Sequence, residues 1–224
     1  MIELFIMGKL LIIQHEDKTS PGTTLDWAHL NSIQVEFWYP AQGQSAPDHN
    51  AFKAIVICGG SMDTHEEEKH PWLIEEKKFI ASLINNNKKI FGICLGSQLI
   101  AESLGGSVHQ HHGWEIGFFS VAIDTNEILH VMQSHRYTFT LPEGATLIAQ
   151  NDFCRHQAYT YGEHIIATQF HPEATVEWIT HKANNTKPER EGQVQTKEEI
   201  LESIHLQKPL QEWFFEKLDK WFHK

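Results

Sequence analysis

Short apolar runs alternate with amphipathic segments along the first half of the chain. Runs typical of buried strands occupy Leu10 to Gln14, Ile33 to Tyr39, Lys53 to Cys58 and Lys89 to Cys94. Segments with helical spacing of apolar residues occupy Gly22 to Asn31, Pro71 to Asn85 and Leu95 to Leu104. Because parallel strands need a long crossover, usually a helix, this alternation predicts a mostly parallel α/β sheet with helices on both faces.

The pattern changes from about Gly117 to Gln169, where strand-like runs follow one another without intervening helices. These runs are F-F-S-V-A-I, Y-T-F-T-L, T-L-I-A-Q and I-I-A-T-Q-F. Strand-rich stretches of this kind commonly form hairpins, so we expect an antiparallel extension of the sheet.

The C-terminal part is polar at first and then amphipathic. Thr180 to Thr196 is predicted to be a surface loop, and the residues from Lys197 to form one helix ending in E-W-F-F-E-K-L-D-K-W-F. Its aromatic stripe is interpreted as cover for the core, with a partner-binding face as the alternative. The residues before Gly8 are expected to be a short extension. With 224 residues, 41% of them hydrophobic, the chain suits a single domain over residues 1–224.

Charge and cysteine content exclude several classes of function. The net charge of −11 leaves no basic surface for phosphate backbones, so nucleic acid is not an expected partner. No apolar run approaches the roughly 20 residues of a membrane span, and we expect no membrane association. Three cysteines, Cys58, Cys94 and Cys154, cannot all pair, which favours the reducing cytoplasm.

One cysteine lies between two glycines where a predicted strand becomes a helix, in Gly92-Ile-Cys94-Leu-Gly96. The glycines permit a tight turn and the close approach of a substrate. A helix N-terminus directs free N–H groups and partial positive charge at the thiol, which favours the nucleophilic thiolate. The same N–H groups can hold an oxyanion. Alone, the motif fits a nucleophile and a buried structural cysteine equally.

The segment T-Q-F-H-P-E, Thr168 to Glu173, offers the base that such a nucleophile needs. Pro172 biases His171 toward extended geometry, and strand alternation then puts His171 and Glu173 on the same side. The carboxylate can hold the imidazole while the other ring nitrogen reaches the thiol. The alternative interpretation is a turn with surface charges.

Together the two motifs resemble the class I glutamine amidotransferases, whose signature is G-x-C-x-G-x-Q followed much later by H-P-E. Here the signature reads from Gly92 to Gln98 and from His171 to Glu173. Segments at Glu115 to Phe118 and Ser134 to Pro142 are similar to the GMP synthase-like branch of that family. The resemblance covers nearly the whole chain and implies a flavodoxin-like fold with no cofactor and no metal.

The resemblance implies attack by Cys94 on the γ-carbonyl of glutamine or of a γ-glutamyl amide. His171, oriented by Glu173, would protonate the departing ammonia or amine, and water would then hydrolyse the γ-glutamyl thioester. The amides of Gly60 and Leu95 would form the oxyanion hole.

The resemblance also assigns the amino-acid end of the small-molecule substrate to Gln98, Ser134 and His135. One departure concerns Ser61, which stands where family members usually have proline. A serine frees one N–H group and loosens the turn that carries Gly60.

Several alternatives stay open. A standalone hydrolase and a glutaminase subunit that delivers ammonia to a separate synthetase both fit, because the chain holds no second domain. The cluster H-Q-H-H at His109 to His112 suggests metal binding, and a catalytically inactive scaffold is a further alternative. His15 follows the first strand at the sheet end where ligands collect, but is interpreted as a hydrogen-bonded packing residue.

Overall fold

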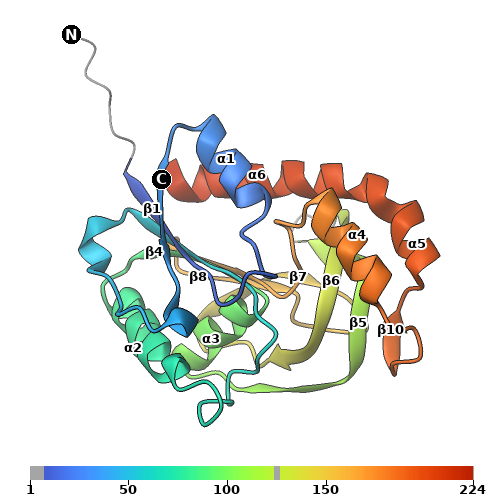
Figure 1. Cartoon of the computed structure of the whole chain (residues 1–224), viewed down its shortest axis with the longest axis horizontal. Coiled ribbons are helices and arrows are strands. Elements are labelled where there is room, and N and C mark those ends of the chain that lie inside the picture. The colour runs from blue at the N-terminus through green and yellow to red at the C-terminus, as the bar shows by residue number, and fades with distance from the viewer. Residues whose placement is uncertain (1–7, 124–126, 224) are drawn as a thin grey trace.

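The computed structural model describes residues 8–123 and 127–223, so the predicted extension before Gly8 lies outside the described residues. Within these ranges ten strands form one sheet, in the order β10-β5-β7-β8-β9-β4-β3-β1-β2, with β6 pairing on β5 (Figure 1). Helices cover both faces of this sheet.

The parallel half of the sheet has flavodoxin-like strand order. Its strands are β2 (Gln34–Trp38), β1 (Lys9–Ile13), β3 (Ala54–Ile57), β4 (Lys89–Ile93) and β9 (Ile165–Thr168). Neighbouring strands in this order are parallel throughout. The order β2-β1-β3-β4-β9 corresponds to the 2-1-3-4-5 arrangement of doubly wound folds, in which ligands bind beyond the carboxyl ends of the strands.

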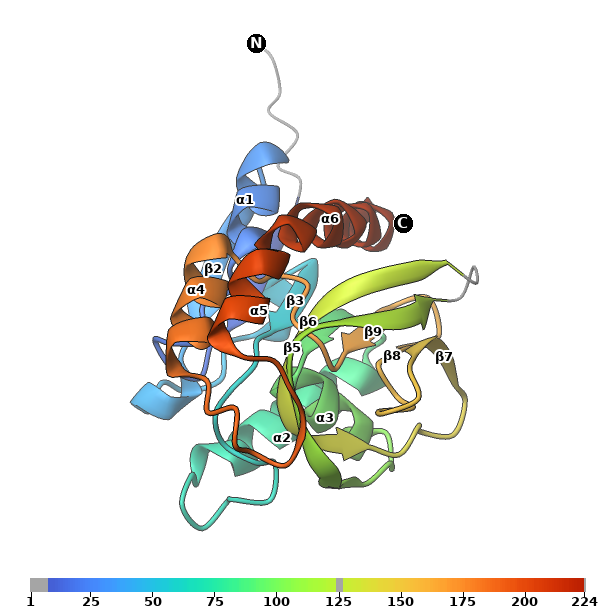
Figure 2. The same cartoon turned by 90° about the vertical axis from the view of Figure 1, so that its right-hand side faces the viewer.

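Strand side chains alternate between two apolar layers, as period-two geometry requires. Leu11, Ile13 and Ile55 pack in the layer that includes α2 (Trp72–Asn85) and α3 (Leu95–Ser103). Leu10 and Ile12 pack in the opposite layer, with α1 (Thr23–Leu30) and α6 (Gln207–His223). Figures 1 and 2 show these helix pairs on opposite sides of the sheet. The predicted mostly parallel sheet with helices on both faces is confirmed.

The antiparallel extension is also confirmed, but it begins earlier than predicted, and its last predicted run, I-I-A-T-Q-F, forms β9, which pairs parallel with β4. The extension consists of β5 (Val108–Ile123), β6 (Ile128–Phe139), β7 (Ala145–Gln150) and β8 (Ala158–Tyr161). β8 pairs antiparallel with β9, which joins the extension to the parallel half. The register of β5 against β6 shifts between Gln110 and Glu115, so the long hairpin bends there.

The predicted loop from Thr180 to Thr196 is wrong over much of its length. Helix α4 runs Val176–Asn185, and β10 (Gly192–Val194) pairs parallel with β5. The side chain of Thr175 accepts a hydrogen bond from the N–H of Trp178 and so caps α4. Because only Ile179 and Ala183 of α4 are buried, its sequence carries a weak apolar pattern.

The single predicted helix from Lys197 is interrupted. It consists of α5 (Lys197–Glu202), a 3-10 turn (Ser203–Leu206) and α6. A capping box formed by Thr196 and Glu199 begins α5. Two further 3-10 turns are Pro40–Gln42 and His49–Ala51.

The aromatic stripe of α6 covers the core, as predicted. Phe214, Trp221 and Phe222 are buried against strand and α1 residues. No helix among the described residues combines the length and apolar character needed to cross a bilayer.

Candidate active site

Cys94 occupies the sharp turn between β4 and α3. Its φ of 51° lies in the left-handed region, which non-glycine residues rarely adopt and which surrounding packing must enforce. A Cβ at Gly96 would lie 2.4 Å from the carbonyl oxygen of Ile57, so glycine lets α3 press against β3. The Cys94 N–H donates to the carbonyl of Thr168 at 2.8 Å, which ties the turn to the end of β9.

The same strand end delivers His171 and Glu173, because β4 and β9 are parallel neighbours. His171 Nδ1 lies 2.8 Å from Glu173 Oε1, and both side chains are buried. Burial lowers the pKa of His171, but the charge of Glu173, followed by the charge and hydrogen bond of Cys94, outweighs it and raises the pKa to about 10. Cys94, His171 and Glu173 are therefore brought together in the predicted order, with a protonated imidazole at neutral pH.

Gly60 and Leu95, the residues expected to form the oxyanion hole, lie near Cys94. Both line one cavity with Cys94, and a Cβ at Gly60 would lie 2.6 Å from Leu95 Cδ2. Leu95 is the first residue of α3, so its N–H has no intrahelical acceptor.

A buried histidine holds the turn that carries Gly60. His15 Nδ1 lies 2.9 Å from the carbonyl oxygen of Gly59, so Nδ1 must be the donor. The Gly59 carbonyl and the Gly60 N–H belong to one planar peptide and point in opposite directions. Fixing the carbonyl on His15 therefore fixes the direction of the Gly60 N–H.

His15 is in turn held by Glu76 of α2. His15 Nε2 lies 2.8 Å from Glu76 Oε1, and neither side chain is exposed. The ring stacks on Trp72 with a centroid separation of 5.5 Å. Burial lowers the pKa of His15, but the charge and hydrogen bond of Glu76 outweigh it, so the pKa is raised. The sequence predicted a hydrogen-bonded packing residue; its connection to Gly60 was not foreseen.

Ser61 has a backbone N–H that a proline at this position would lack, and this N–H has a hydrogen-bond acceptor. Its backbone N–H donates to Glu16 Oε1 at 2.8 Å, and its hydroxyl donates to Glu16 Oε2 at 2.9 Å. The turn that the sequence suggested would be loose is thus anchored at Ser61 by Glu16 and at Gly59 by His15.

Gln98 reaches the site through a second glutamine. Its Nε2 donates to the carbonyl of Tyr137 and to Gln169 Oε1, both at 3.1 Å. Gln169 Nε2 lies 3.7 Å from Cys94 Sγ. Gln169 was missed by the sequence reasoning, although it belongs to the same T-Q-F-H-P-E segment.

The two β6 residues differ in what they offer a substrate. Ser134 lines the cavity beside Cys94. His135 also borders this cavity, but its Nδ1 lies 3.1 Å from the Tyr137 carbonyl and its Nε2 2.9 Å from Glu115 Oε2. Both ring nitrogens of His135 are therefore engaged within the protein.

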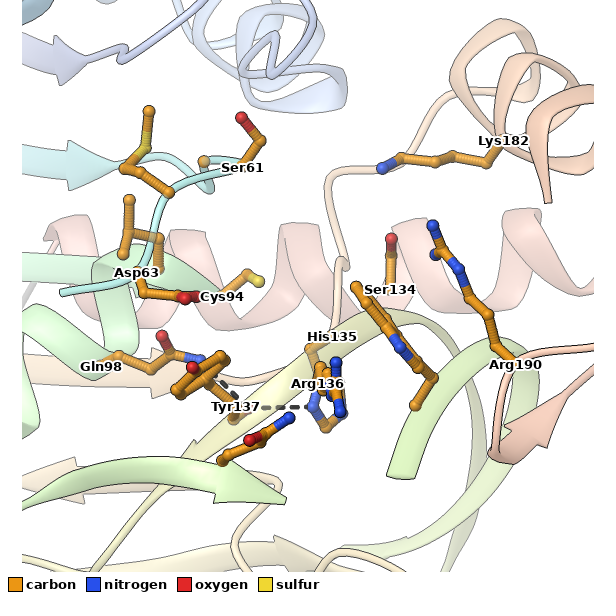
Figure 3. Close-up of a pocket in the computed structure, with 15 residues that line it drawn as sticks. Ser61, Asp63, Cys94, Gln98, Ser134, His135, Arg136, Tyr137, Lys182 and Arg190 are labelled. Carbon is orange, nitrogen blue, oxygen red and sulfur yellow. Dashed lines mark hydrogen bonds between the residues drawn. The ribbon is translucent and has the colours of Figure 1, made fainter. Parts of the chain in front are cut away.

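Two adjoining cavities open at Cys94. One of about 380 Å³ is lined by Gln98 and Tyr137, among others, and a second of about 300 Å³ is lined by His171 and Trp178. Figure 3 shows Ser134, Lys182 and Arg190 directed toward the space beside the thiol.

One group of potential metal ligands is present in the part of the chain that the structure describes, and it does not include the histidine cluster singled out in the sequence. Donor atoms of Glu115, His135 and Cys154 lie within 4.8 Å of one another. Glu115 already accepts hydrogen bonds from His135, Asn151 and Gln157, so this group forms a closed polar network. His109 to His112 lie on β5 and are not part of that group.

The other two cysteines have raised pKa values. All three are unpaired and buried. Burial raises the pKa of Cys58 far above its usual value and that of Cys154 to about 11. Both thiols therefore remain protonated at neutral pH.

Comparisons with known proteins place the chain among similar sequences and folds. A family model described as glutamine amidotransferase class-I matches residues 28–186. A glutamine amidotransferase-like protein of Salmonella typhimurium, YfeJ, is 28% identical over 182 residues, covering 75% of this chain and 76% of that protein.

Gamma-glutamyl peptidase 2 of Arabidopsis thaliana is 32% identical over 139 residues, covering 56% of this chain. The match spans about half of that peptidase, 55% of its length. The crystal structure of a Thermotoga maritima glutamine amidotransferase has the same fold, with a TM-score of 0.85 at 24% identity, covering 96% of this chain and 98% of that one.

Proposed function

The chain belongs to the class I glutamine amidotransferase family, and we propose that it hydrolyses the γ-amide of glutamine or of a γ-glutamyl compound. The observation that carries the proposal is the cysteine at the β4–α3 turn with a His171–Glu173 pair behind it, joined at 2.8 Å. Family members whose names denote γ-glutamyl peptidases support this class of substrate.

The proposed reaction begins with attack of Cys94 Sγ on the γ-carbonyl carbon. The N–H groups of Gly60 and Leu95 stabilise the negative charge that develops on the carbonyl oxygen. His171 gives its proton to the departing nitrogen as the C–N bond breaks, and a γ-glutamyl thioester remains on Cys94.

Hydrolysis of the thioester completes the proposed cycle. Water loses a proton to His171 and attacks the thioester carbonyl, the C–S bond breaks, and glutamate leaves. Glu173 orients His171 and stabilises its charged form through the hydrogen bond to Nδ1. Gln98 and Ser134 are proposed to hold the amino-acid end, together with the backbone of His135.

The second candidate function is a glutaminase subunit that delivers ammonia to a separate synthetase, and membership of an amidotransferase family favours it. The two candidates differ in whether the chain works alone. Steady release of glutamate by the purified chain supports the hydrolase, whereas turnover only after a partner is added supports the subunit.

We also propose that residues 1–224 form one domain, because the described helices pack on a single sheet. The three unpaired cysteines support a reducing compartment, for which we propose the cytoplasm.

The proposal is tested by incubating the purified chain with glutamine and with γ-glutamyl dipeptides and measuring glutamate directly. Glutamate release by the wild-type chain that is absent in Cys94→Ala supports the proposed function. If no γ-glutamyl compound yields glutamate, or if Cys94→Ala matches the wild type, the proposed function is wrong.

A further inference from the structure

The second cavity at Cys94 lies on the side from which the leaving group departs. His171, the proposed donor of a proton to the leaving nitrogen, lines this cavity, whereas Gln98 and Tyr137 line the first. The first cavity therefore suits the glutamyl part of a substrate. If the leaving group were ammonia, it would occupy little of the second cavity, which has a volume of about 300 Å³.

Lys182 of α4 brings a positive charge to this side. It lines both cavities, and its Nζ lies 4.9 Å from the centre of the Trp178 ring. The Trp178 ring lies 4.8 Å from that of His171, so Lys182 and the proton donor border the same aromatic side chain. Of the two cavities, Trp178 lines the second and not the first. Because the Lys182 ammonium lies over the Trp178 ring, the lysine lies beside the path of the leaving group.

No carboxylate in residues 8–123 and 127–223 lies within 4.0 Å of the Lys182 ammonium. This is notable in a chain with 29 acidic and 18 basic side chains. Burial and the charge of Arg190 lower the pKa of Lys182, and burial outweighs the charges of Cys94, Glu16 and Glu173, which act to raise it. A partly dehydrated cation without a counter-ion in contact is a binding site for an anionic group.

The acidic residue in the second cavity does not fill this role. Glu16 also lines it, but its two carboxylate oxygens accept hydrogen bonds from the N–H and the hydroxyl of Ser61. Lys18 and Arg190 add further positive charge to the cavity wall. The cationic side chains that line the second cavity, Lys18, Lys182 and Arg190, therefore outnumber its one carboxylate, which favours an anionic group there.

We propose that Lys182 binds the carboxylate of the amino acid joined to the γ-glutamyl group, so that the substrate is a γ-glutamyl amino acid or peptide. This inference rests on the proposed hydrolysis at Cys94. The reaction adds one water across the amide bond and yields glutamate and a free amino acid whose carboxylate Lys182 held.

The test compares γ-glutamyl-alanine with γ-glutamyl-alaninamide, which differ only in the terminal carboxylate, and includes glutamine as a third substrate. Wild type should show a kcat/KM at least about tenfold higher for the acid than for the amide, the scale of a charge-assisted hydrogen bond. Lys182→Met should bring that ratio close to one, and Lys182→Arg should restore part of it. Lys187→Met, at an exposed lysine outside both cavities, should leave the ratio unchanged.

Two outcomes would overturn the inference while leaving the proposed function intact. One is equal kcat/KM for the acid and the amide in wild type. The other is a fall in kcat/KM by the same factor for all three substrates in Lys182→Met. That result would assign the lysine to the glutamyl end of the substrate or to the thiolate.

Binding measurements make the inference independent of turnover. Calorimetry on Cys94→Ala should show tighter binding of γ-glutamyl-alanine than of the amide, with the difference removed by adding Lys182→Met. Equal binding of the two would overturn the inference. Failure of the proposed function would instead appear as absence of glutamate release from every substrate.

Discussion

Replacing His15 with alanine tests whether the Gly59–Gly60 peptide is held for catalysis. The substitution removes two buried hydrogen bonds, of 2.9 Å to the Gly59 carbonyl and 2.8 Å to Glu76. Breaking a buried charged pair from one side commonly costs about 3–5 kcal/mol. We therefore expect the free energy of unfolding, measured with denaturant, to fall by about that amount.

The same substitution should lower activity through Gly60. Loss of one oxyanion-hole donor typically costs about 10²–10³-fold in kcat, so an N–H that is misdirected rather than removed should cost about 10–100-fold. Because the donor acts in the transition state, kcat and kcat/KM should fall together. Glutamate release under conditions where His15→Ala is fully folded measures both.

Glu76→Gln provides the matched control. The glutamine amide can donate to Nε2 of a neutral imidazole, which leaves Nδ1–H on the Gly59 carbonyl. We expect less than about a tenfold loss of kcat in this variant. A folded His15→Ala protein whose kcat is within twofold of wild type would refute the role of His15 in directing the Gly60 N–H.

Three further predictions concern the thiols, the histidine and the core. A glutamine-like diazo-ketone should label Cys94 and spare Cys58 and Cys154, whose pKa values burial raises; a peptide map with label on either of them would contradict this. Burial lowers the pKa of His171, but Glu173 and Cys94 raise it by more. The resulting pKa of His171 is about 10. Its stabilising protonation is thus complete below about pH 6.5 and is lost as the pH rises toward 10. The difference in unfolding free energy between wild type and His171→Gln should shrink across that window, and a constant difference would refute it. Leu218→Ala, at a fully buried position of α6, should lower the unfolding free energy by about 2–5 kcal/mol in denaturant melts, and a loss below 1 kcal/mol would contradict the packing of α6 on the sheet.

The sequence predicted the parts of the fold that depend on local patterns. Apolar runs such as Leu10 to Gln14 identify strands because burial on both faces demands unbroken apolar residues. Helix α4 was missed because it buries chiefly Ile179 and Ala183, and its remaining residues are polar or exposed. The three-residue strand β10 forms only because β5 offers an edge to pair with, which no local pattern records.

Predictions for the site divide in the same way. The proximity of Cys94 and His171 was predictable because each lies in a short motif tied to a strand end. Lys182 was not predictable, and for His15 only a hydrogen-bonded packing role was, because the importance of both comes from contacts across the fold, with Trp178 and with the Gly59 carbonyl. An isolated lysine or histidine in a sequence carries no sign of such contacts.

The most direct test of the central claim is to trap the covalent intermediate. The chain is mixed with a γ-glutamyl dipeptide and quenched in acid at successive times, and its peptides are mapped by mass spectrometry. We expect a γ-glutamyl group on the peptide that contains Cys94, and neither adduct nor glutamate release in Cys94→Ala. Glutamate formation without an adduct on Cys94, at an undiminished rate in Cys94→Ala, would contradict the central claim.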